Sequence, residues 1–227
     1  MISGRTRLVA LLGHPVAHSL SPRLQNAAFA ALALDFAYVA LDIPPERLEE
    51  AVRGLVPLGF AGANVTAPHK LAVASLVETD EPSVNTLVIR DGAVRGRTTD
   101  AAILGGLPAE RPVIVGDGGS AVAFQRALPH ARVFSRRGEW PPDVAGADLV
   151  VHATSEREEV LFRIEPGQTL VELPYPDSAT ALAAREAGAI VVGGLDVLVA
   201  QGAASFQLWT GVPAPVEVMR AAVDLPA

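Results

Sequence analysis

Residues 113–121 read "VIVGDGGSA", and this stretch decides how the second half of the chain folds. The apolar run predicts a short buried strand, and the glycines after it open a helix. Gly116, Gly118 and Ala121 have the spacing of a dinucleotide-binding turn, which needs a tight bend, a close backbone approach to pyrophosphate, and tight strand-helix packing. The helix N-terminus adds an anion site. The predicted cofactor residues of this turn are Gly116, Gly118, Gly119, Ser120 and Ala121. A glycine-rich turn without a ligand is the alternative.

The strand after this turn bears on the choice of cofactor. An acidic residue there would bind the ribose of NAD, whereas an arginine would accept the 2'-phosphate of NADP. The sequence offers Ser135, Arg136 and Arg137 and no carboxylate, which favours NADP through charge-assisted hydrogen bonds. Two arginines on a solvated loop are the alternative. Asp117, within the turn, would place a carboxylate beside the pyrophosphate.

Working outward, short apolar runs alternate with helical segments, which predicts an α/β fold with parallel strands. Strands are expected at residues 7–13, 36–43, 60–66 and 84–96, the last a hairpin, and in the second half at 112–115, 131–136, 147–154, 169–175 and 189–194. The hairpin should turn at Asp91-Gly92. Ser21 is expected to cap the helix that follows it, with Pro22 at the first helical position. Two closing helices, at residues 197–211 and 215–225, are expected to pack back on the first domain.

The composition limits the possible functions. The chain has 227 residues, no cysteine and a formal net charge of -7. Thiol chemistry is therefore excluded, and the charge disfavours nucleic acid and anionic membranes. The best apolar run, eight residues, is far shorter than the roughly 18 of a membrane span. We expect a cytoplasmic protein, a monomer or homodimer, with a small-molecule partner, no metal, no nucleic acid and no membrane.

Polar residues in the first half predict a second site. Ser19 and Ser21 lie on a loop that enters a helix, where two hydroxyls would suit a small carboxylate, although helix capping alone would also explain Ser21. Asn64, Thr66 and Lys70 bring donors and acceptors to the end of a strand, at the edge where open α/β sheets bind ligands. A partly desolvated Lys70 would have a lowered pKa and could shuttle a proton. Asp100 could orient it, or could simply cap a helix.

In this order, the segments resemble the shikimate dehydrogenase family over most of the chain. The matching motifs are S-x-S at 19–21, N-V-T-x-P-x-K at 64–70, V-N-T at 84–86, the Asp of G-x-N-T-D at Asp100, an N-A-T-S-like "HATS" at 152–155, "ELPYP" at 172–176 and the closing segment 193–211. The chain is shorter than is usual for the family. It also has His152 where the family has Asn, and Glu172 where the family has Asp.

The resemblance implies two α/β domains and NADPH-dependent reduction of 3-dehydroshikimate to shikimate. Lys70 would be the acid/base group, paired with Asp100. The implied substrate-binding residues are Ser19, Ser21, Thr66, Asn85, Tyr175 and Gln201, and Thr154 and Gly194 join the cofactor residues. Residues 1–98 plus 197–227 would form the substrate domain, and 99–196 a Rossmann-like NADP domain. A quinate or aminoshikimate dehydrogenase, or a catalytically weak ligand-binding relative, is the alternative.

Overall fold

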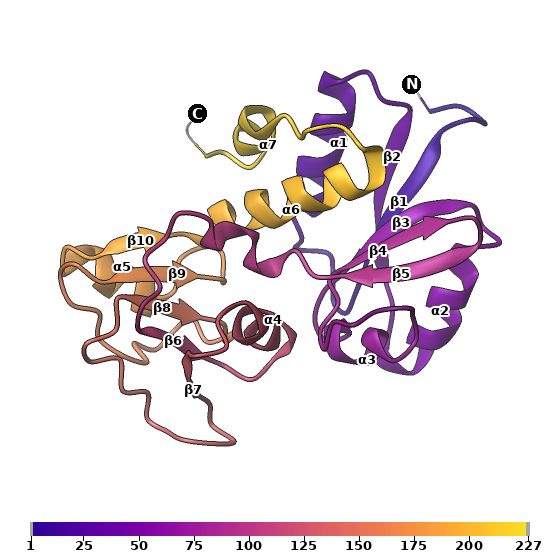
Figure 1. The fold of residues 1–227 in the computed structure, drawn as a ribbon. Helices are drawn as coiled ribbons and strands as arrows, with labels where there is room; N and C mark the ends of the chain where they lie inside the picture. Colours follow the sequence, from indigo (N-terminus) through magenta and orange to yellow (C-terminus); the bar gives the residue numbers. More distant parts are fainter. Residues whose placement is uncertain (1, 226–227) are drawn as a thin grey trace. The chain divides into compact units, whose positions relative to one another are not determined.

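The chain folds into two compact units, each with its own five-stranded sheet. The computed structural model describes residues 2–225. The first unit comprises Met1–Thr99 and Val199–Ala227, and the second comprises Asp100–Leu198. The predicted α/β fold, with two sheets and with closing helices that return to the first unit, is confirmed (Figure 1).

The first sheet has the strand order β2-β1-β3-β4-β5. Its strands are β1 (Arg7–Gly13), β2 (Phe36–Asp42), β3 (Phe60–Val65), β4 (Thr86–Arg90) and β5 (Ala93–Arg97). β1 runs parallel to β2 and β3, while β3, β4 and β5 pair antiparallel. The β4–β5 turn is the predicted one, because Asp91 and Gly92 both have positive φ, at 52° and 77°, as a tight hairpin turn requires.

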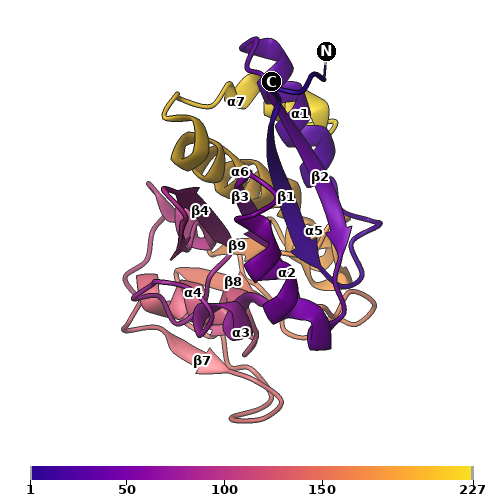
Figure 2. The ribbon, with the colours of Figure 1, turned by 90° about the vertical axis from the view of Figure 1, so that its right-hand side faces the viewer.

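Helices cover both faces of this sheet (Figures 1 and 2). The helical elements of the unit are α1 (Ser21–Ala31), the 3-10 turn η1 (Pro45–Arg47), α2 (Leu48–Leu55), α3 (Lys70–Ala74), the end of α6 (Gly194–Thr210) and α7 (Val216–Ala222). On one face, Val52 and Leu55 of α2 pack with Ala63 and Leu87 of the sheet. On the other face, Phe29 of α1 stacks on Phe206 of α6, with ring centroids 5.2 Å apart. Burial of these apolar side chains is the main stabilising term.

Helix α1 starts one residue earlier than we predicted. Leu20, not Ser21, is the N-cap residue, and it makes no side-chain capping bond. The Ser19 hydroxyl accepts the N–H of Ser21 at 3.2 Å, and the Leu20 carbonyl already accepts the N–H of Leu24. Ser21 is therefore the first helical residue, and its expected capping role is wrong.

A tryptophan fixes the end of α6 on the first sheet. Trp209 is 4% exposed, and its Nε1–H donates to the carbonyl of Leu87 at 2.9 Å. The indole lies over Gly62 in β3, where a Cβ atom would overlap both the indole nitrogen and the Leu87 carbonyl oxygen. Only glycine leaves room for this contact.

The second sheet is entirely parallel, with the order β10-β9-β8-β6-β7. Its elements are η2 (Asp100–Leu104), β6 (Pro112–Val115), α4 (Gly119–Ala127), β7 (Arg132–Phe134), β8 (Leu149–His152), β9 (Thr169–Glu172), α5 (Ala179–Glu186), β10 (Ile190–Val192) and the start of α6. The connections β7–β8 and β8–β9 contain no helix (Figure 1). Instead, Val144, Phe162 and Ile164 from these loops pack on the sheet.

No helix in the stretch from residue 2 to residue 225 has the length and apolarity needed to cross a membrane.

We predict that Gly62→Ala lowers the free energy of unfolding by about 1–3 kcal/mol, because the added methyl group overpacks the Trp209 contact. Denaturant unfolding, followed by fluorescence and by circular dichroism, measures this. Gly54→Ala is the matched control. Gly54 lies inside α2, and its new Cβ would meet only Leu58 Cδ1, at 3.9 Å, so this change should stabilise by about 0.5–1 kcal/mol. Equal effects of the two changes would contradict the packing argument.

Candidate active site

The first sheet changes direction between β1 and β3, and the predicted substrate residues lie at this point. From β1 the chain crosses to β2 on one side, and it returns to β3 on the other. Open α/β sheets bind ligands at such a switch point, outside the carboxyl ends of the strands. The loop after β1 carries Ser19 and Ser21, and the segment after β3 carries Thr66 and Lys70.

The two loops lie against each other. The carbonyl of Ala67 accepts the N–H of His14 at 3.1 Å, and that of Leu12 accepts the N–H of Thr66 at 2.9 Å. A Cβ atom at Gly13 would overlap the methyl group of Thr66, so glycine permits this approach. The segment after β1 and the segment after β3 are therefore neighbours where they leave the sheet.

Lys70 is half-buried and is the first residue of α3. Its carbonyl accepts the N–H of Val84 at 2.9 Å, which places the backbone of Lys70 next to the residue that precedes Asn85. Helix α3 has only five residues, so its dipole is too small to act strongly on the ammonium.

Asn64 is the centre of a buried hydrogen-bond network at the end of β3. Its Oδ1 accepts the hydroxyl of Tyr38 at 2.9 Å. Its amide nitrogen lies within hydrogen-bond distance of the Asn85 carbonyl, the Thr86 hydroxyl and the Ser205 hydroxyl, at 3.1, 3.1 and 2.9 Å. Because Asn64 is only 4% exposed, water cannot satisfy its amide group, and these protein groups provide its hydrogen bonds instead.

The network extends to two predicted substrate residues. Asn85 Oδ1 accepts the N–H of Thr99 at 2.8 Å, and its amide nitrogen donates to Gln201 Oε1 at 3.3 Å. Asn85 is 2% exposed and Gln201 is half-buried. The structure therefore brings Asn85 and Gln201 together although 116 residues separate them. Asp100 follows Thr99 directly, is 6% exposed and begins η2.

The second sheet has its own switch point, between β6 and β8. A hollow of about 300 Å³ lies at the carboxyl ends of these strands and of β7. Its lining residues are Gly116, Asp117, Ser135, Arg136, Arg137, Trp140, Thr154, Ser155, Glu156 and Leu161. Five of the predicted cofactor residues, from three separate segments, thus line one cavity of the size that small-molecule sites have.

The glycine turn has the properties that a dinucleotide requires. Gly116 has φ of 137°, and a Cβ atom there would come within 2.7 Å of the Ala153 carbonyl oxygen. No atom lies within 4 Å of the Cβ position at Gly118, so this edge is open to a pyrophosphate. Ala121 is 2% exposed, packed between helix and strand. Gly119 and Ser120 open α4.

Both arginines after β7 lie near carboxylates. Arg137 Nε is 3.7 Å from Asp117 Oδ2, and Arg136 Nη2 is 3.9 Å from Glu156 Oε2 and 4.0 Å from Glu159 Oε2. The Arg136 guanidinium also lies over the ring of Trp140, 5.6 Å from its centroid. Both arginines line the hollow, where they could bind the 2'-phosphate of NADP, but two acidic residues, Asp117 and Glu156, line it as well.

A buried hydrogen-bonded pair supports one of the loops that line this hollow. His152 Nδ1 is 2.7 Å from Glu172 Oε2, and both side chains are fully buried. His152 Nε2 is 2.7 Å from the hydroxyl of Thr154, which accepts the N–H of Glu156 at 3.1 Å. Hydrogen bonds therefore lead from the sheet to the loop at residues 154–159. Within the described part of the chain, Glu172 Oε1 has no hydrogen-bond partner.

Two further predicted residues lie near each other in the second unit. Tyr175 follows β9, and Gly194 begins α6 after β10. A Cβ atom at Gly194 would overlap the carbonyl oxygen of Pro174, so a glycine is needed for this close approach. Among residues 2–225, no group of three His, Asp or Glu side chains could hold a metal ion.

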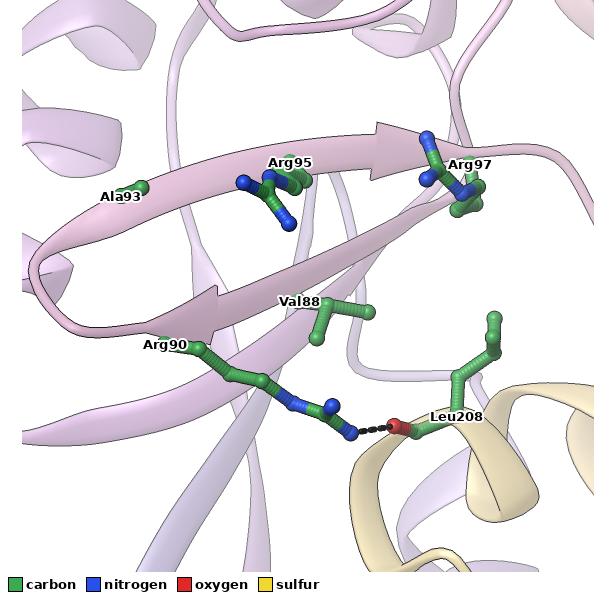
Figure 3. Close-up of a pocket in the computed structure, with 6 residues that line it drawn as sticks. All are labelled: Val88, Arg90, Ala93, Arg95, Arg97 and Leu208. Carbon is green, nitrogen blue, oxygen red and sulfur yellow. Dashed lines mark hydrogen bonds between the residues drawn. The ribbon is translucent and has the colours of Figure 1, made fainter.

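Another hollow, of about 150 Å³, lies on the first unit over the β4–β5 hairpin (Figure 3). Arg90, Arg95 and Arg97 surround it, and Arg90 Nη2 donates to the carbonyl of Leu208 at 3.1 Å. It contains none of the predicted site residues.

Sequence reasoning missed several residues of both sites. Tyr38 and Ser205 read as ordinary strand and helix residues, and nothing local connects them with Asn64. Glu156 and Trp140 belong to loops without a motif. The N-V-T-x-P-x-K motif includes Asn64, but it does not indicate which residues supply the buried partners that an asparagine inside an apolar strand needs.

Comparison with known proteins agrees with this geometry. Residues 11–87 match the family model "Shikimate dehydrogenase substrate binding domain", and residues 194–223 match "Shikimate 5'-dehydrogenase C-terminal domain". A relative from Anaeromyxobacter dehalogenans, "Shikimate dehydrogenase (NADP(+))", is 40% identical over an alignment of 272 residues that covers 99% of this chain and 98% of the relative. Since this chain has 227 residues, at least 45 aligned positions of the relative have no counterpart in it.

Solved structures give the same result. The Thermus thermophilus shikimate 5-dehydrogenase, in complex with NADP(H) and shikimate, has a TM-score of 0.85 and 30% identity, covering 95% of this chain and 98% of that one. The Aquifex aeolicus shikimate dehydrogenase has a TM-score of 0.89 and 28% identity, covering 99% and 100%.

Two α/β units, one of them with a glycine turn at the switch point of a parallel sheet, define a two-domain dinucleotide-binding protein of the Rossmann type. With 40% identity to a relative over nearly its whole length, the chain belongs to the shikimate dehydrogenase family.

We predict that His152→Ala costs about 1–3 kcal/mol of unfolding free energy, because it leaves the Glu172 side chain buried without its hydrogen-bond partner. Denaturant unfolding, followed by tryptophan fluorescence and by circular dichroism, measures this. The double variant His152→Leu/Glu172→Leu removes both polar groups and should recover most of the loss. A single variant as stable as the parent protein would contradict a tight buried pair.

Proposed function

We propose that this protein catalyses the NADPH-dependent reduction of 3-dehydroshikimate to shikimate, as an oxidoreductase that acts on a CH–OH group. The observation that carries the proposal is the 40% identity, over nearly the whole chain, with a relative named shikimate dehydrogenase (NADP(+)). The Thermus thermophilus structure, which contains NADP(H) and shikimate, supports the same substrate and cofactor.

Bound NADPH supplies the hydride. Lys70 donates the proton that the ketone oxygen needs as it becomes a hydroxyl, and in the reverse direction it removes this proton. The half-buried position of Lys70, on a short helix at the sheet's switch point, supports this role. Asp100 is proposed as the carboxylate that orients the ammonium group.

The first unit is the proposed substrate domain. Ser19 and Ser21 bind the substrate carboxylate at the start of α1. Since Leu20 is the N-cap residue of α1, capping does not explain the Ser21 hydroxyl, which supports a role in ligand binding. Thr66, Asn85 and Gln201 bind the ring hydroxyls, and the network around Asn64 holds Asn85 in position. Tyr175, in the second unit, is proposed as a further substrate residue.

The second unit is the proposed NADP domain. The glycine turn takes the pyrophosphate, and Ser135, Arg136 and Arg137 take the 2'-phosphate. The residues fit this group, since Gly116 of the turn and two guanidiniums line the hollow of about 300 Å³, and the space beside the neighbouring Gly118 is open. Thr154 and Gly194 complete the proposed cofactor residues.

A quinate or aminoshikimate dehydrogenase would use the same framework. The relatives described above carry shikimate in their names, which favours shikimate over these substrates and over a catalytically weak binding protein. A cytoplasmic location, the absence of nucleic-acid partners, and a monomeric or homodimeric state stay predictions.

A spectrophotometric assay of the purified protein tests the proposal. Shikimate and NADP, compared with quinate and with NAD, are followed at the absorbance of reduced nicotinamide. We expect turnover with shikimate and NADP. A folded protein that oxidises neither shikimate nor quinate with either cofactor would contradict the proposal and favour the binding-protein alternative.

We predict that Lys70→Ala lowers kcat by about 100-fold or more while KM for shikimate changes little, because the lost group acts on the proton in the transition state. Steady-state kinetics at several pH values measure this. The control is Lys70→Arg, which keeps the cation but cannot release a proton near neutral pH. If either variant retains the parent's kcat, Lys70 is not the acid/base group.

A further inference from the structure

The two arginines that face the cofactor hollow are outnumbered by carboxylates. Asp117, Glu156 and Glu159 each have an oxygen within 4.0 Å of a guanidinium nitrogen of Arg136 or Arg137. Three negative charges therefore face two positive ones. A 2'-phosphate would add a charge of about -1.5 to -2 to this cluster.

Glu156 differs from the other two carboxylates because the backbone holds it. Its Oε1 accepts the N–H groups of Arg157, Glu158 and Glu159 at 2.9, 2.9 and 3.3 Å. These bonds, that of Glu158 first, outweigh burial and lower the pKa of the Glu156 carboxyl, with a smaller contribution from Arg136. Its side chain is 27% exposed, against 71% for Glu159. The Glu156 carboxylate is thus held in one position and in its charged form by these hydrogen bonds.

The contact between Glu156 and Arg136 acts through charge rather than geometry. At 3.9 Å, the separation of Nη2 and Oε2 is too long for a hydrogen bond, and among the described residues neither Arg136 nor Arg137 donates one. Glu156 therefore does not set the orientation of the guanidinium. Its negative charge offsets the positive potential that Arg136 would otherwise offer to a phosphate.

We propose that Glu156 is a specificity-determining residue of the cofactor site, a fixed internal anion that competes with the 2'-phosphate of NADP for Arg136 and so limits the preference for NADP over NAD. The proposal rests on the NADP binding put forward above. NAD has a hydroxyl in place of the phosphate, so it does not experience this competition.

Asp117 differs from Glu156 because its charge can act on the pyrophosphate as well as on an arginine, Arg137, whose Nε lies 3.7 Å from Asp117 Oδ2. It lies within the glycine turn, next to Gly118, where the pyrophosphate common to NAD and NADP is expected. Its charge should therefore weaken the binding of both cofactors. This difference separates the two carboxylates experimentally.

The test measures dissociation constants of 2',5'-ADP, 5'-AMP, NADP and NAD by isothermal titration, together with turnover of shikimate. Glu156→Gln is the main variant, since its amide oxygen can still accept the three backbone N–H groups. We expect it to tighten 2',5'-ADP and NADP by about 3- to 10-fold and to leave 5'-AMP and NAD unchanged. Glu159→Gln is the matched control. It lies at nearly the same distance from Arg136 but is more exposed, so its effect should be smaller. Asp117→Asn should tighten NAD as well as NADP, and Arg136→Ala should weaken only the ligands that carry a 2'-phosphate, 2',5'-ADP and NADP.

The outcomes are separable. An unchanged or weaker affinity of Glu156→Gln for 2',5'-ADP, in a protein that turns over shikimate with NADP, overturns the competition and leaves the proposed function intact. A tighter affinity without any turnover of shikimate supports the competition and counts against the proposed reaction. Equal tightening of 5'-AMP and 2',5'-ADP would also overturn the assignment, because the effect would not concern the 2'-phosphate.

Discussion

The first unit depends on satisfying one buried amide, that of Asn64. An amide removed from water costs free energy unless it is hydrogen-bonded, and each missing partner would cost about 1–3 kcal/mol. The partners come from β2, from β4 with the residue before it, and from α6, so the penalty is avoided only when these elements meet. Asn85 and Gln201 gain their positions from the same requirement. Packing forces alone would not fix these side chains so closely, because apolar contacts have no direction.

Much of the fold could be predicted from local pattern, whereas much of the site could not. The glycine turn, the hairpin at Asp91-Gly92 and the positions of most strands could be predicted from residues that are neighbours in the sequence. The buried network could not, since Ser205 lies 141 residues from Asn64. The prediction that Ser21 caps α1 is wrong because the helix begins one residue earlier, so that Leu20 is the N-cap residue. Glu156 lies in a loop that reads as solvated charge, and only the three converging N–H groups distinguish it.

The second unit keeps a five-stranded parallel sheet although two of its connections are loops without a helix. Two of its crossovers contain no helix, yet the sheet face beneath them is covered by single apolar side chains such as Phe162 and Ile164. Ordering a loop costs conformational entropy, and a loop lacks the regular hydrogen bonds of a helix. Loops that cover a sheet therefore need specific contacts that hold them in place. Gln168 provides one, because its amide nitrogen reaches the carbonyls of Val144 and Ala147 at 3.0 and 2.8 Å. The Glu172–His152–Thr154 hydrogen bonds hold the neighbouring loop in a similar way.

The return of α6 and α7 to the first sheet has a consequence for synthesis on the ribosome. Residues 1–99 emerge first. At that stage Phe206 and Trp209, which pack on Phe29 and Gly62 in the folded protein, have not yet been synthesised. The second unit is continuous in sequence and can finish folding before the first one is complete. A nascent chain therefore carries an uncovered apolar face for about half of its translation, and during this interval it is a natural client for chaperones that bind such surfaces.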